Sequence, residues 1–158
     1  MQRRTKDAFL WIMSILHRHR IPYRISGGLA ARIYGSKRRL ADIDIDIPDK
    51  IHENRILSEV GDYIIFGPKR YVDHQFDLLL MTLKYKGQKI DICVGEHEKL
   101  FDHEKKEWVA NKIDLSKHVD KKVYGLVARV IPKNDLIAYK RLMARKVDIA
   151  DVKCLLKT

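Results

Sequence analysis

The stretch ISGGLAARIYGSKRRLADIDIDI, residues 25–47, carries most of the structural information in this chain. At its end, aspartate and isoleucine alternate from Asp42 to Ile47. Neighbouring side chains of a β-strand point to opposite faces, so the three isoleucines can enter a core while the three aspartates line the other face. Aspartates two residues apart stand roughly 7 Å apart and repel one another. Because this repulsion costs stability, we expect the clustered aspartates to serve a function, which is to bind a divalent cation together with a phosphorylated ligand.

A glycine pair precedes the acidic strand. We expect a short strand over residues 23–26, a turn at Gly27 and Gly28, and a helix over 29–34 that ends at Gly35. Backbone N–H groups at a helix N-terminus bind phosphate, and glycine lets the backbone approach closely. Ser26 can add a hydroxyl to such a site. The basic run at residues 37–39, which contains Arg38, is either part of that site or a solvated charge run.

A third carboxylate comes from further along the chain. Residues 76–85 and 89–94 flank a Lys-Gly-Gln turn, which predicts a β-hairpin whose second strand carries Asp91 between two isoleucines. Two Mg²⁺ ions about 3.5–4 Å apart can clamp the oxygens of a phosphoryl transfer when carboxylates converge from neighbouring strands. Asp42, Asp44 and Asp91 are the candidates. The competing interpretation is the solvent-facing side of half-buried strands. Asp46 is expected at the rim or in a salt bridge.

The remaining pattern predicts helices over residues 5–19, 49–60, 135–143 and 147–156, and strands over 63–66 and 123–131. The fold class is therefore α/β (α+β), with a mixed sheet, a β-hairpin and flanking helices. A chain of 158 residues fits a single domain, 1–158. We expect a catalytic core over about 5–95, and a C-terminal strand and helices over about 120–157.

Charge and composition restrict the partners. The formal net charge is +11, and residues 1–40 hold ten Lys or Arg against one acid. Such a field favours polyanions, although it can also serve solubility alone. No apolar run approaches a membrane span, so no membrane partner is expected. Cys93 and Cys154 lie in apolar contexts, as buried free thiols of a reducing cytosol do, which predicts a cytoplasmic protein.

These motifs resemble the nucleotidyltransferase superfamily with the DNA polymerase β-like catalytic fold. The family pattern is an apolar residue, a Gly-Gly or Gly-Ser pair, a short helix, Asp-x-Asp, and a third Asp on a later strand. The thirteen residues between the glycine pair and Asp42 look more like the AbiEii-type toxin group and its small uncharacterised relatives. Arg38, four residues before Asp-x-Asp, fits that group. Lys140 and the run from Lys146 to Asp151 are similar to its C-terminal helices.

The resemblance implies a Mg²⁺-dependent nucleotidyltransferase, with two ions and with Mn²⁺ as a substitute, that moves a nucleoside monophosphate from an NTP to a hydroxyl and releases pyrophosphate. The roles that it implies are metal binding by three aspartates and triphosphate binding by five further residues: Asp42, Asp44 and Asp91; Ser26, Gly27, Gly28, Arg38 and Lys140. For Lys140 the alternative is a surface helix lysine, and for Asp148 and Asp151 it is surface acids. Leu40 departs from the family's Ser or Thr, and Asp44-x-Asp46 is a second possible register.

The acceptor stays open between tRNA or another nucleic acid, a protein, and a small molecule such as an antibiotic. The resemblance also implies a toxin–antitoxin setting, with a cognate antitoxin protein as partner. Two other functions compete with the enzyme. One is a catalytically degenerate nucleotide- or RNA-binding domain of the same fold. The other is a generic basic RNA-binding module, which would need no Mg²⁺ and would depend steeply on salt.

Overall fold

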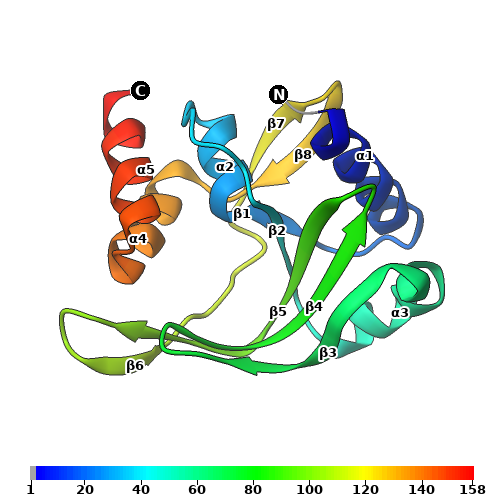
Figure 1. The fold of residues 1–158 in the computed structure, drawn as a ribbon, viewed down its shortest axis with the longest axis horizontal. Helices are drawn as coiled ribbons and strands as arrows, with labels where there is room; N and C mark the ends of the chain where they lie inside the picture. Colours follow the sequence, from blue (N-terminus) through cyan, green and yellow to red (C-terminus); the bar gives the residue numbers. More distant parts are fainter. Residues whose placement is uncertain (1–2) are drawn as a thin grey trace.

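The computed structural model describes residues 3–158 and contains one mixed sheet flanked by helices (Figure 1). The strand order is β3-β4-β5-β2-β1-β8-β7, and β6 pairs with β5 outside this path. The strands are β1 (Arg24–Ser26), β2 (Asp42–Ile47), β3 (Ile64–Val72), β4 (Phe76–Tyr85), β5 (Gln88–Asp102), β6 (Glu107–Ala110), β7 (Val119–Val123) and β8 (Leu126–Val130). The helices are α1 (Arg3–Arg18), α2 (Gly27–Ile33), α3 (Lys50–Val60), the 3₁₀ turn η1 (Gly61–Tyr63), α4 (Lys133–Met143) and α5 (Lys146–Lys157).

Strand β2 lies in the middle of this sheet, antiparallel to β1 and parallel to β5. Its alternation works as the sequence predicts. Ile43, Ile45 and Ile47 are fully buried in the core, so the aspartates are left on the opposite face. Ile90 and Ile92 of β5 are buried in the same way, and they leave Asp91 on the aspartate face. The predicted α/β class with a mixed sheet and flanking helices is confirmed.

Helices lie at both ends of the molecule in Figure 1, and α2 lies between them. There α4 and α5, in orange and red, lie side by side at one end, and α1 and α3 lie at the other. The apolar stripe of α1 joins the core through Phe9, Ile12, Met13 and Leu16. Within residues 3–158, no helix is long and apolar enough to cross a membrane.

Three strand predictions are wrong in extent or number. Strand β3 runs to Val72 and β5 to Asp102, well beyond the expected ends at residues 66 and 94. The extension of β5 pairs with β6, which the sequence pattern did not predict. The single strand expected over 123–131 is instead the second half of a hairpin. Tyr124 and Gly125 turn the chain with positive φ between β7 and β8, and a run of apolar residues hid that turn.

Candidate active site

Two of the candidate carboxylates stand side by side on neighbouring parallel strands. The register pairs Asp44 of β2 directly with Asp91 of β5, and Asp42 with Lys89. One cavity of ≈ 510 Å³ reaches all the site residues that the sequence nominated. They are Ser26, Gly27, Gly28, Arg38, Asp42, Asp44, Asp91 and Lys140. The structure therefore brings together, at one place, residues that are up to 114 positions apart in the chain.

Gly27 is needed because Asp44 lies against it. Its φ is +61°, a backbone conformation that L side chains rarely adopt, and a Cβ there would fall 2.0 Å from Asp44 Oδ2. The second glycine is less strictly required. A Cβ on Gly28 would sit 3.1 Å from both Arg38 Nη2 and Leu40 Cδ1. The pair therefore lets the β1–α2 turn pack directly on the acidic strand.

The carboxylates of the cavity disfavour one another's charge. Burial raises the pKa of Asp44 well above its usual range, and the nearby charges of Asp91, Asp42 and Asp46 raise it further, while Lys140 acts against them. Burial also raises the pKa of Asp91, although the Thr82 hydroxyl, which donates to Asp91 Oδ1 at 2.6 Å, partly offsets this. A bound cation would relieve this cost, because an opposite charge favours ionised carboxylates.

The two candidate phosphate-binding cations are held by acids of α5. Lys140 is 2% exposed, so the surface interpretation is wrong for it. Its Nζ lies 2.9 Å from Asp151 Oδ2 and 3.3 Å from Asp148 Oδ1. The Arg38 guanidinium pairs with the same Asp151 at 2.9 Å and is part-exposed toward the cavity.

The acids of this network are also buried, so the surface interpretation is wrong for Asp148 and Asp151 too. Burial alone would raise the pKa of Asp151, but hydrogen bonds from Arg38, Lys140 and Ser36 outweigh it and lower the pKa. Asp151 is therefore an anion that fixes both cations beside the cavity.

Asp46 takes part in a buried salt bridge. Its Oδ2 lies 3.4 Å from Arg24 Nη2, and its Oδ1 accepts a hydrogen bond from the Ser26 hydroxyl at 3.3 Å. The salt-bridge expectation is confirmed, but the rim location is wrong because Asp46 is buried. Since Asp46 is occupied in this way, the arrangement favours Asp42-x-Asp44 as the open pair. The Ser26 hydroxyl points to Asp46, which leaves less of it for a phosphate.

The donor set suits a hard divalent cation. Mg²⁺ prefers carboxylate oxygens together with substrate phosphates and water, and the three aspartates of the cavity offer such oxygens. Among residues 3–158, no three His, Cys, Asp or Glu side chains are already gathered closely enough to hold an ion. Binding would therefore require the carboxylates of Asp42, Asp44 and Asp91 to turn toward one another.

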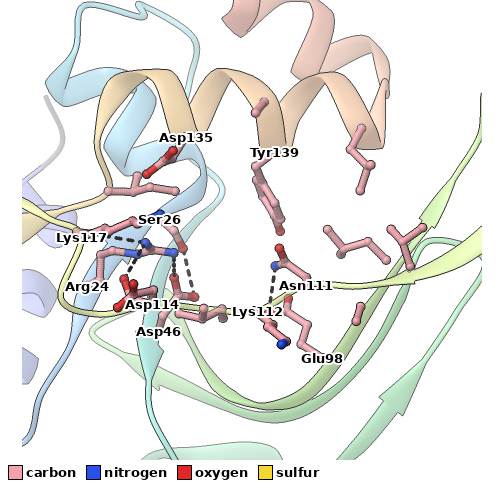
Figure 2. A pocket seen from close by; sticks show the side chains of 17 residues that line it. Arg24, Ser26, Asp46, Glu98, Asn111, Lys112, Asp114, Lys117, Asp135 and Tyr139 are labelled. Carbon is pink, nitrogen blue, oxygen red and sulfur yellow. Dashed lines mark hydrogen bonds and ion pairs between the residues drawn. The ribbon is translucent and has the colours of Figure 1, made fainter.

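Figure 2 shows a second cavity, of ≈ 330 Å³. The two cavities share four lining residues, which are Ser26, Asp46, Glu98 and Tyr139. Sequence reasoning missed Glu98. The sequence offered no signal for it, because the predicted strand ends at residue 94. In the structure β5 runs to Asp102, and Glu98 stands two residues before the buried Leu100 and so points to the same side of the strand.

Comparisons with known proteins agree with this fold. No protein-family model and no curated protein matches the sequence. The candidate nucleotidyltransferase TM1012 from Thermotoga maritima matches with a TM-score of 0.66 at 16% identity, over 99% of this chain and 94% of that one. The lincosamide antibiotic adenylyltransferase LnuA, solved with lincomycin, matches with a TM-score of 0.62 at 16% identity, over 94% of each chain.

A third similar structure is the antibiotic-resistance factor ANT(2'')-Ia, solved with adenylyl-2''-tobramycin. It matches with a TM-score of 0.59 at 12% identity, over 97% of this chain and 88% of that one. At such low identities these TM-scores show a shared fold and no more. The chain thus has the nucleotidyltransferase fold, in agreement with the resemblance in its motifs.

Proposed function

We propose that this protein is a Mg²⁺-dependent nucleotidyltransferase that moves a nucleoside monophosphate from an NTP to a hydroxyl acceptor and releases pyrophosphate. The observation that carries the proposal is the direct pairing of Asp44 with Asp91 beside Gly27, inside a cavity that Arg38 and Lys140 also line. Nucleotidyltransferases of the same fold, including an antibiotic adenylyltransferase, support it.

Each residue has a proposed task. Asp42, Asp44 and Asp91 would hold two Mg²⁺ ions, or Mn²⁺ in their place, which when bound polarise the phosphates and neutralise their charge. The backbone of Gly27 and Gly28, with the Ser26 hydroxyl, would position the triphosphate, and Arg38 and Lys140 would balance its charge. Asp91 would accept the proton of the acceptor hydroxyl. The acceptor oxygen then bonds to the α-phosphorus, and the bond from that phosphorus to the bridging oxygen breaks.

The proposal also covers the biological role of the protein and the class of its acceptor. Closeness to the AbiEii-type group would imply a cytoplasmic toxin with an antitoxin partner, and the net charge of +11 would suit tRNA or another nucleic acid as acceptor. LnuA is a lincosamide antibiotic adenylyltransferase, so a small molecule is an acceptor class of equal interest.

The test is a transfer assay with each α-labelled NTP, Mg²⁺, and either total tRNA or a panel of small hydroxylated compounds. Wild-type protein should move label to one acceptor class. Asp44→Asn keeps the shape of the side chain but removes a metal-binding charge, and it should lower the rate by at least about a hundredfold. Asp62→Asn, a change at an exposed acid outside both cavities, is the matched control and should leave the rate unchanged.

The second candidate function is a catalytically degenerate domain that binds a nucleotide. Two observations favour it: Asp151 already occupies Arg38 and Lys140, and apolar Leu40 lines the cavity where the family often has a hydroxyl. This alternative predicts NTP binding by calorimetry that Asp44→Asn weakens, with no transfer to any acceptor. Transfer that persists unchanged in Asp44→Asn would contradict both functions.

A further inference from the structure

The second cavity meets the first at a wall that contains a buried, only partly compensated acid. Glu98 is 5% exposed and lines both cavities. Its Oε2 accepts a hydrogen bond from Asn111 Nδ2 at 3.2 Å, and no ion pair to it is found within residues 3–158. Figure 2 shows Asn111 and the hydroxyl end of Tyr139 facing each other above Glu98.

The hydrogen bond from Asn111 and the charge of Arg24 favour the ionised form of Glu98, but they offset only part of the cost of its burial. Arg24 is committed to Asp46 and to the backbone carbonyls of Asp114 and Lys117, both at 3.3 Å from its Nη1. Burial, and then the charge of Asp46, raise the pKa of Glu98 to about 8. A cation bound beside this carboxyl would favour its ionised form and pair with it.

The other walls indicate the shape of such a ligand. An apolar surface is formed by side chains from β5, β6, α4, the segment before β7 and the residue after β8: Leu100, Val109, Leu142, Ile113 and Ile131. Asn111 and Tyr139 offer hydrogen bonds at the inner end. A ring with one apolar face and an amine at its inner end would match the apolar wall, Asn111, Tyr139 and Glu98. Charged side chains line the rest of the cavity and offer partners for the hydroxyls of the ring: Arg24, Lys112, Asp114, Lys117 and Asp135.

We propose that the second cavity is the acceptor pocket, and that Glu98 binds the protonated amine of a small hydroxylated acceptor such as an amino sugar. This inference rests on the proposed nucleotidyl transfer. The amine would then bind at the wall that Glu98 and Tyr139 contribute to both cavities, so the rest of the acceptor would lie next to the first cavity. A volume of ≈ 330 Å³ admits one ring, which favours a small acceptor over the body of a folded RNA.

Binding can be tested without nucleotide or metal. Saturation-transfer NMR would compare glucosamine with glucose, and mannosamine with mannose, on wild type, Glu98→Gln and Glu96→Gln. Glu98→Gln keeps the shape and removes the charge, and it should weaken binding of the amines by at least about tenfold without affecting the neutral sugars. Glu96→Gln changes an exposed acid of the same strand that lines neither cavity, so it should bind like wild type. Equal binding of amine and neutral sugars, or amine binding unchanged in Glu98→Gln, overturns the proposal.

Transfer assays separate this proposal from the proposed function. If amines bind through Glu98 but no label moves from any NTP, the binding site stands and the transfer reaction fails. If label moves to tRNA at the same rate in wild type and Glu98→Gln, the reaction stands and the amine acceptor is overturned. Label on an amine acceptor that is lost in both Asp44→Asn and Glu98→Gln supports both.

Discussion

At Gly27 the backbone lies directly against the side chain of Asp44. We predict that Gly27→Ala costs about 2–5 kcal/mol of unfolding free energy, because it adds an unfavourable positive φ and a clash with Asp44. Gly125→Ala is the matched control. Gly125 also has positive φ (+84°), but a Cβ there meets nothing within 4 Å, so it should cost only about 1–2 kcal/mol. Urea unfolding followed by circular dichroism measures both, and equal costs would show that the contact with Asp44 is unimportant.

Glu98 should make stability depend on pH. Its pKa is about 8 in the folded protein against 4.5 as the ordinary value, so the folded state holds the proton more tightly. Stability is therefore lost as pH rises from about 4.5 to 8 and changes little beyond. We predict that Glu98→Gln gains on the order of 1–3 kcal/mol over wild type across this window. Thermal melts at pH 5 and pH 8 test this, and Glu96→Gln should show no such gain.

Helix α5 is joined to the residues of the first cavity by side-chain ion pairs as well as by apolar contacts. Asp151→Asn should cost on the order of 3–5 kcal/mol, because it leaves buried Lys140 with only Asp148 and releases Arg38. In a double-mutant cycle with Lys140→Met, the coupling energy should exceed about 1 kcal/mol. Chemical denaturation of the four proteins gives this value, and strictly additive effects would refute a shared network.

At the level of elements, the sequence was informative where the pattern was local. The alternation at 42–47 placed the isoleucines in the core and the aspartates opposite them, and the hairpin at 76–94 was found from its turn. The ends of β3 and β5 could not be predicted, because pairing with β4 and β6 extends them through charged and mixed segments. Partners far along the chain, not propensity, determine those ends.

In the candidate site, too, local motifs were predictable and contacts between distant parts of the chain were not. Nominated residues came from motifs and do lie together, but the burial of Lys140 and Asp148 depends on how α4 packs against α5. No spacing rule reports that packing. Glu98 was missed because a glutamate flanked by His97 and Lys99 looks like a surface residue, and only the long β5 strand turns it inward.

The whole molecule carries a net charge of +11, which predicts a general attraction to nucleic acid. We expect any affinity for single-stranded RNA to fall by at least about tenfold between 50 and 200 mM salt, without a need for Mg²⁺. Fluorescence anisotropy with labelled RNA measures this, and Asp44→Asn should behave like wild type. A salt-independent affinity that requires Mg²⁺ would instead indicate that RNA engages the acidic cavity.

The side-by-side placement of Asp44 and Asp91 lowers the stability of the fold at the site where the proposed activity needs both carboxylates. Two partly buried acids that repel each other weaken the resting fold, so Asp44→Asn should melt at a higher temperature than wild type even though transfer should be lost. A cation that binds between the two carboxylates should raise the melting temperature of wild type, because it removes this repulsion. The melting temperature of Asp44→Asn should change little. Heating the two proteins side by side with candidate ions and nucleotides would therefore act as a search for the natural ligand before any product is known.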